Sequence, residues 1–277
     1  MPKKQVFWGL HARPNTILKW VLAALPFVLA LIIYLVASDM RHAANPQDKL
    51  LPGIGRMIAS FKDLVLTPDK RTGDILLLTD TLASLKRLVT GVVLAAAGGL
   101  LLGVNMGLLP GIRALKLPFV TFLSMIPALA ILPILFISFG VGETAKIMLI
   151  LLGVFPVITR DIYLAATRVP REQVVKALTL GASGAGVIYR VVLPQILPRL
   201  IDTVRLSLGP AWLFLIASEA IASTNGLGYR IFLVRRYMAM DVILPYVLWI
   251  TFMGFSMDWL LRRLNGWRYP WYQREEG

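Results

Sequence analysis

Few residues in this chain could carry out catalysis. It has two histidines, His11 and His42, and no cysteine, so disulfides and thiolate metal sites are excluded and a histidine-based site is not expected. The serines in apolar stretches have no histidine nearby to act as a base; they are Ser84, Ser124, Ser138, Ser207 and Ser218. The sequence contains no Gly-x-x-x-x-Gly-Lys-Ser/Thr loop. We therefore predict a non-enzymatic chain that holds no metal and does not bind ATP phosphates itself.

The charged residues inside apolar stretches are more informative. Lys86, Arg87 and Glu219 stand in such stretches, where a charge costs several kcal/mol unless it faces a cavity or a partner. Lys86 and Arg87 point about 100° apart on a helix, so they cannot both face one cavity equally. An Arg87 that lines a path would favour an anion; the alternative is snorkelling to the headgroups. Glu219 could pair with Arg87 and hold a gate, or be a satisfied structural acid.

The composition is that of a membrane protein. Hydrophobic residues make up 57% and charged residues 16% of the 277 residues, against about 45–50% and 25% in soluble domains. The net charge is +14, but the basic residues flank apolar runs and form no single tract, which favours an orientation signal over nucleic-acid binding.

Six apolar runs are long enough to cross a bilayer as helices, which predicts an all-α membrane protein. They are residues 17–38, 82–108, 117–139, 144–166, 201–222 and 242–263. The first follows basic residues, as in a signal peptide, but exceeds a signal core of about 7–15 residues, so we expect a retained anchor.

Lysine and arginine predict the orientation. With the N-terminus inside, 17 of them lie in inner segments and 10 in outer segments, which favours cytoplasmic N- and C-termini. The predicted organisation is a cytoplasmic tail (1–16), the first span (17–38), a periplasmic segment (39–81), a core (82–264) and a cytoplasmic tail (265–277). In the periplasmic segment one helical face carries Ile54, Ile58, Phe61 and Val65, which indicates an amphipathic surface helix.

Small residues and prolines mark the spans. Four-residue spacing places Gly91, Ala95, Gly99, Gly103 and Gly107 on one face of the second span, where another helix can approach closely. We expect helices to be interrupted inside the bilayer at Pro127, Pro133, Pro156 and Pro210. We also expect Arg160 to pair with Asp161 at the inner surface, and Asp258 with Arg262 four residues on.

A polar stretch between the fourth and fifth spans predicts a docking element for a cytoplasmic partner. A short helix beginning near Glu172 ends at Gly181, where small residues allow a sharp turn. Leu193-Pro194 and Leu197-Pro198 are then expected to stop helices and redirect the chain into the membrane. The alternative is a merely structural hairpin.

The same stretch resembles a signature of the permease subunits of binding-protein-dependent ABC importers. That signature reads Glu-Ala-Ala, three residues, Gly, nine residues, Ile, one residue, Leu-Pro. Gly181, Val191 and Leu193-Pro194 keep its spacing, whereas Val175-Lys176-Ala177 matches only the last alanine of its beginning.

Further fragments resemble the nitrate/sulfonate/taurine branch, in the same order along most of the chain. They are Leu51-Pro52, Ser84-Leu85-Lys86-Arg87-Leu88, Ile126-Pro127 with Leu129-Ala130 and Leu132-Pro133, the turn from Phe139 to Lys146, Leu180-Gly181-Ala182-Ser183, and Glu219 followed by Gly226-Leu227-Gly228. The chain departs from the branch at Ser124-Met125, where many relatives have Arg-Pro, and at Ile131, where a Trp is common.

The resemblance implies a type I importer permease fold with about six transmembrane helices in a bacterial inner membrane. It implies a second permease copy (as a homodimer), two cytoplasmic ATPase subunits that carry ATP and Mg²⁺ and hold residues 172–186 within the coupling segment 167–200, and an extracytoplasmic binding protein. The solute would be a small anion. A stand-alone secondary transporter or a non-transporting scaffold is the alternative.

Two sets of site residues follow from the resemblance. The ATPase-coupling residues are Glu172, Ala177, Leu178, Gly181, Ala182, Ser183, Leu193 and Pro194. The residues of the translocation path or gate are Ser84, Arg87, Ser124, Met125, Pro127, Glu219, Gly226 and Gly228. Arg87 matches the arginine of the family, which favours its place in the path.

Overall fold

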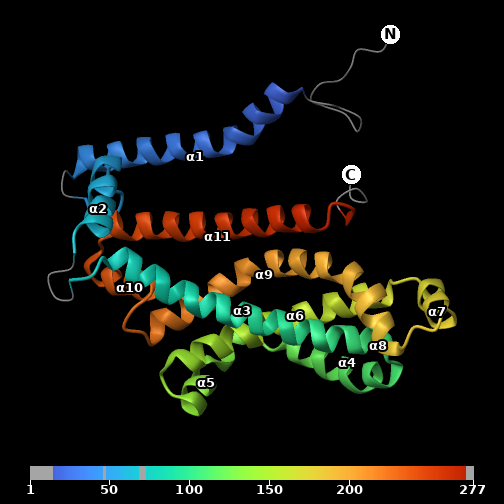
Figure 1. Ribbon diagram of the computed structural model, residues 1–277. Helices are drawn as coiled ribbons and strands as arrows, with labels where there is room; N and C mark the ends of the chain where they lie inside the picture. Colours follow the sequence, from blue (N-terminus) through green and yellow to red (C-terminus); the bar gives the residue numbers. More distant parts are fainter. Residues whose placement is uncertain (1–14, 46–47, 69–72, 273–277) are drawn as a thin grey trace, which may run out of the picture.

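The computed structural model describes residues 15–45, 48–68 and 73–272, and within these ranges the chain is helical with no strand (Figure 1). The fold class predicted from the sequence is therefore confirmed. Residues 1–14 of the predicted tail 1–16 and residues 273–277 of the predicted tail 265–277 lie outside the described residues, and residues 265–268 belong to the last long helix.

Five long helices are apolar and long enough to cross a membrane, which confirms five of the six predicted spans. They are α1 (Thr16–Ala44), α3 (Leu76–Leu108), α6 (Glu143–Thr167), α9 (Leu193–Ile221) and α11 (Met240–Arg268).

The third predicted span, 117–139, is formed by a bent pair of helices, with the interruption at Pro127 that the sequence predicts. The chain forms α4 (Pro110–Met125), a 3₁₀ turn η1 (Ala128–Ile131) and α5 (Leu132–Phe139), and the two halves are bent by 85°. Ile126 is extended because it precedes Pro127, whose ring disfavours the helical conformation of the residue before it.

Pro133 lies in the first turn of α5, directly after η1, whereas the other prolines do not interrupt helices as predicted. Pro156 lies inside α6, and Pro210 and Pro198 lie inside α9. Pro194 also starts no break: α8 (Gly184–Val187) continues through the π-helical turn η2 (Ile188–Val192) into α9. The wider turn lets Leu193 N–H donate to the Ile188 carbonyl, so the helix direction is kept through the Leu-Pro pair.

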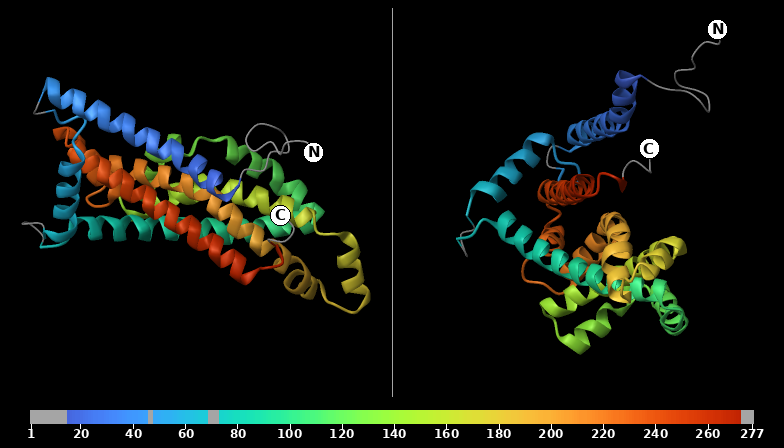
Figure 2. Two further views of the ribbon diagram at one scale, coloured as in Figure 1. Left: turned by 90° about the horizontal axis from the view of Figure 1, so that it is seen from above. Right: turned by 45° about the vertical axis from the view of Figure 1, so that its right-hand side comes forward.

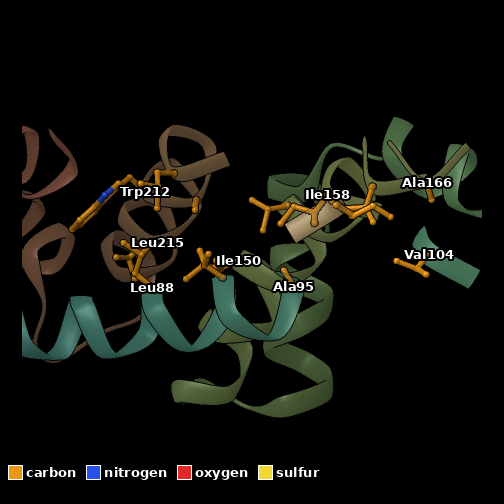
Figure 3. Packing of buried hydrophobic residues seen from close by; sticks show 14 of the residues in the cluster. Leu88, Ala95, Val104, Ile150, Ile158, Ala166, Trp212 and Leu215 are labelled. Carbon is orange, nitrogen blue, oxygen red and sulfur yellow. The ribbon is translucent and has the colours of Figure 1, made fainter. Parts of the chain in front are cut away.

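The glycine stripe of α3 packs against α6, as predicted. A Cβ on Gly107 would lie 2.3 Å from the Cβ of Ala166, and one on Gly103 would lie 2.8 Å from the Thr159 carbonyl oxygen. Only glycine allows this approach. Figure 3 shows the resulting core, in which Leu88 of α3, Ile150 of α6 and Leu215 of α9 meet.

α1 stands apart from the other long helices (Figures 1 and 2). Ser38 is its one buried residue among those described. The Tyr34 hydroxyl donates to the Pro52 carbonyl at 2.6 Å and the Ser38 hydroxyl to the Leu51 carbonyl at 3.0 Å. α2 (Ile54–Leu66) follows and is amphipathic, as predicted.

The remaining short helices mark two ends of the bundle. α10 (Leu227–Val234) and η3 (Arg235–Tyr237) lie at the end that also holds α2, beside the beginning of α3. α7 (Arg171–Thr179) and α8 lie at the opposite end (Figure 2). We call these the α2 end and the α7 end.

Candidate functional site

A polar network with a buried centre lies at the α2 end, where α3, α6, α9, α10 and α11 meet. Its members are Asp80, Ser84, Arg87, Glu143, Lys146, Glu219, Ser223, Asn225, Arg230 and Tyr246. Three of them come from one face of α3, because Asp80, Ser84 and Arg87 are spaced four and three residues apart.

The network holds the turn that begins α10. Three successive backbone N–H groups donate to side chains from other helices: Gly226 to Asp80 at 2.9 Å, Leu227 to Ser84 at 2.8 Å, and Gly228 to Glu219 at 2.9 Å. The N-terminus of a helix leaves such groups without partners in its own backbone. Here tertiary side chains satisfy them, so the turn is fixed to α3 and α9.

Both glycines of this turn are required by the space around them. Gly226 has φ +119°, and a Cβ there would lie 2.5 Å from the carboxyl carbon of Glu219. A Cβ on Gly228 would lie 2.7 Å from the Ile216 carbonyl oxygen. A side chain at either position would push the turn off the carboxylate.

Arg87 is the centre of the network. Its guanidinium donates to Glu219 at 2.6 Å, twice to Glu143, and to the backbone and side-chain oxygens of Asn225 at 3.0 and 2.5 Å. These bonds use all five of its N–H groups. The side chain is 2% exposed, so the snorkelling interpretation is wrong, and the pairing with Glu219 is confirmed.

Glu219 is fully buried and accepts from three directions. The Ser84 hydroxyl lies 2.8 and 2.9 Å from its two oxygens, and Arg87 and Gly228 supply the other bonds. A buried carboxylate needs this degree of pairing to remain charged.

Several members of the network were not among the predicted site residues. Asp80 accepts from Arg230 at 2.8 Å and from the Tyr246 hydroxyl at 3.1 Å. Lys146 is buried and donates to Glu143 at 3.3 Å and to Ser223 at 3.0 Å. The sequence did contain signals for these members. Asp80 stands four residues before Ser84, and Glu143 and Lys146 are opposite charges three residues apart at the start of the fourth span.

The charges of the network balance among the described residues. Three acids, Asp80, Glu143 and Glu219, face three bases, Arg87, Lys146 and Arg230. No group of three or more His, Cys, Asp or Glu side chains that could hold a metal ion occurs in the described ranges. The arrangement joins α3, α6, α9 and α10 at this end of the bundle.

The other predicted path residues lie elsewhere. Ser124, Met125 and Pro127 are exposed at the bend between α4 and η1. They do not contact the polar network; the Ser124 hydroxyl donates to the Thr121 carbonyl of its own helix.

A second candidate site is the turn between α7 and α8 at the α7 end. Gly181 has φ +85°, its N–H donates to the Leu178 carbonyl, and the Ala182 N–H donates to the Ala177 carbonyl. This is the Schellman pattern of a helix C-terminus. The Ser183 hydroxyl then accepts from the Gly186 N–H at 3.1 Å and caps α8. The sequence thus folds into two short helices joined by a tight corner.

The predicted coupling residues divide by exposure. Glu172, Leu178, Gly181 and Ser183 are exposed, whereas Ala177, Ala182, Leu193 and Pro194 are half-buried against the bundle. Three apolar side chains outside the list of predicted coupling residues are also exposed at this end: Val175, Leu180 and Tyr189. An exposed apolar surface of this kind favours contact with another protein.

The α7 end is tied to the long helices by polar contacts. The Gln195 amide donates to Gln173 at 2.9 Å, which joins α9 to α7. Asp161 accepts two bonds of 2.7 Å from Arg199 of the neighbouring helix α9, so the predicted Arg160–Asp161 pair is wrong. The predicted Asp258–Arg262 pair is confirmed at 3.0 Å.

Sequence comparison finds relatives of this chain. Residues 95–267 match the family model described as "Binding-protein-dependent transport system inner membrane component". The taurine transport system permease protein TauC of Escherichia coli is 35% identical over 190 residues, which cover 69% of each chain. The bicarbonate transport system permease protein CmpB of Synechococcus elongatus is 28% identical over 92% of this chain and 94% of its own.

Structural comparison supports the same fold. A chain of the inward-facing MetNI methionine ABC transporter aligns with a TM-score of 0.60 over 69% of this chain and 94% of its own, at 19% identity. At that identity the likeness concerns the fold alone.

Proposed function

This chain belongs to the family of binding-protein-dependent transport system inner membrane components, as the permease subunit of an ABC importer, and we propose that two copies of it enclose the pathway of a small anion. Two ATPase subunits bind the α7–α8 turn and supply the energy from ATP and Mg²⁺. An extracytoplasmic binding protein delivers the solute at the α2 end. Both termini lie in the cytoplasm.

The observation that carries this proposal is the separation of two different sites to opposite ends of one bundle (Figure 2). The α7 end presents an exposed corner with apolar side chains, as a docking element for a soluble partner would. The α2 end buries a charged network around the turn of residues 226–228. A transporter driven by a partner needs a contact for that partner on one side and a controlled opening on the other.

The anionic solute class rests on two supports. The relatives include proteins named for transport of taurine, aliphatic sulfonates and bicarbonate. The network at the proposed entrance contains Arg87, the residue type suited to bidentate contact with carboxylate and sulfonate groups.

We assign the gate to the turn fixed by Ser84, Arg87 and Glu219, with Gly226 and Gly228 allowing its close approach. We assign Ser124, Met125 and Pro127 to the path, because the broken helix places irregular backbone at this point and such backbone is tolerated in membranes where it lines a cavity or is buried in protein.

The test is purification and reconstitution. The tagged chain, extracted in mild detergent, should retain an ATPase subunit, and proteoliposomes holding the complex should take up labelled taurine only with ATP and the binding protein. Uptake by the chain alone would favour a stand-alone secondary transporter. A chain that retains no ATPase subunit and supports no taurine uptake would favour a scaffold.

The orientation has a separate test. The chain lacks cysteine, so Ser183→Cys introduces a single label site at an exposed turn. We expect a membrane-impermeant maleimide to label it in inside-out vesicles and not in intact cells. Asp39→Cys, at the other end of the bundle, should show the reverse pattern. Labelling of Cys at position 183 from outside would overturn the proposed topology.

A further inference from the structure

Glu143 differs from the rest of the charged cluster that surrounds it. Its side chain is 58% exposed, whereas Arg87 and Lys146, the two cations that it contacts, are 2% and 4% exposed. The carboxylate therefore covers two buried positive charges from the solvent side. It receives two bonds from Arg87, one of them 2.7 Å, and one of 3.3 Å from Lys146.

The two cations have further partners that do not depend on Glu143. Arg87 also donates to Glu219 and Asn225, and Lys146 donates to Ser223. Glu219 in turn is held by Ser84 and Gly228. Withdrawal of the Glu143 side chain would leave the cations in place and bring their excess charge to the surface.

Glu143 is also placed where its side chain can leave. It is the first residue of α6, preceded by a turn in which Gly140 has φ +75°. A Cβ on Gly140 or Gly142 would meet no atom within 4 Å, so the turn is not packed against the bundle. The carboxylate can rotate into solvent without displacing a buried side chain.

We propose that the Glu143 carboxylate occupies a binding site for an oxyanion, and that a solute carboxylate, sulfonate or bicarbonate displaces it from Arg87 and Lys146. The exchange replaces one anion with another, so the charge balance of the buried cations is kept. The guanidinium edge that now makes two bonds to Glu143 would make them to two oxygens of the solute, and the Lys146 ammonium would face the same anion.

This site deepens the proposed function, on which it rests, by placing the first contact of the solute with the membrane subunit at the entrance. It also gives Glu143 a role as an internal competitor. The solute binds only when its local concentration is high, as it is when a loaded binding protein is docked above the entrance.

The experiment is titration calorimetry of the purified complex in detergent with sodium methanesulfonate, against sodium chloride of equal ionic strength. Glu143→Gln removes the competing charge and keeps the side-chain shape. We expect it to bind methanesulfonate about tenfold more tightly than the wild type, as for removal of one charged hydrogen-bonding competitor. Asp39→Asn removes an exposed acid outside the network and should leave the affinity unchanged.

A second variant keeps the result interpretable. In Glu143→Gln/Lys146→Met the two lost charges cancel, so the fold should be kept while the gain in affinity disappears. Equal affinity in Glu143→Gln and the wild type, or an equal gain in Asp39→Asn, would overturn the site. Taurine uptake by the wild-type complex tests the proposed function separately: if uptake occurs and Glu143→Gln shows no gain, only this site is wrong.

Discussion

Replacing Glu219 with leucine should destabilise the chain strongly and release the turn at residues 226–228. Glu219 is fully buried and accepts hydrogen bonds from Ser84, Arg87 and Gly228. Removing one partner of a buried ion pair costs about 3–5 kcal/mol, because the remaining charge loses its compensation. We expect the midpoint of thermal unfolding in detergent to fall by roughly 10 °C.

Two further variants serve as controls for the loss of stability in Glu219→Leu. Arg262→Gln breaks an exposed pair in which the arginine side chain is 62% exposed, and such pairs contribute at most about 1 kcal/mol. Arg87→Met combined with Glu219→Leu removes both buried charges and should recover part of the stability, since apolar replacement of a whole pair is often tolerated. If Glu219→Leu were as stable as Arg262→Gln, the network would not be what holds the turn.

The sequence carried enough information for most of the bundle. Runs of about twenty apolar residues located five spans, and the four-residue spacing of glycines located the contact between α3 and α6. The pairing of Arg87 with Glu219 could also be predicted, because a charge in an apolar helix is costly unless an opposite charge lies next to it. This holds even when the two residues are far apart in the sequence.

Proline was the main source of error. A proline removes one N–H and disfavours helix in the residue before it, but the outcome depends on the neighbouring packing. At Pro127 the chain bends by 85° between α4 and α5, whereas Pro198 and Pro210 remain inside α9. The sequence contains the same residue in both settings, so only tertiary contacts distinguish them.

The full network was not predictable from spacing within one helix. Asp80, Ser84 and Arg87 share a face of α3, but their partners come from the start of α6, the end of α9 and the turn before α10. Three pieces of the family resemblance, residues 84–88, 139–146 and 219–228, therefore meet at one place. These pieces follow one another along the chain in the order that the resemblance implies, and the fold brings them together at the α2 end.

α9 connects the two sites mechanically. It begins beside α7, to which Gln195 is bonded, and carries Glu219 near its other end, roughly 40 Å away at 1.5 Å per residue. We expect α9 to move as one body, so that a small tilt at the α7 end becomes a displacement at the polar network. We expect variants of either site to change the response of the other, as coupling between sites is reciprocal.

Replacing Gly181 with glutamate should abolish the ATPase activity stimulated by the loaded binding protein, while the chain remains in the membrane. Gly181 has φ +85°, a conformation that costs an ordinary residue roughly 1–2 kcal/mol, and it forms the corner between α7 and α8. A Cβ there would meet no atom within 4 Å, so the bundle itself should tolerate the change. The added length and charge would project from the exposed corner that we propose to dock on the ATPase.

Gly181→Asn provides the matched control for this experiment. Asparagine adopts the left-handed conformation more readily than other residues with a side chain, is uncharged, and is shorter than glutamate, so it should keep the corner and retain most of the stimulated activity. The measurements are the amount of chain in the membrane, the ATPase retained on purification, and the stimulated rate in proteoliposomes. ATPase stimulation of Gly181→Glu at the wild-type level would contradict docking at this corner. A close contact with the ATPase would have no room for the glutamate side chain at the exposed apex. Loss in Gly181→Glu with retention in Gly181→Asn, at equal amounts of chain in the membrane, would place the energy-coupling contact on the short α7–α8 corner.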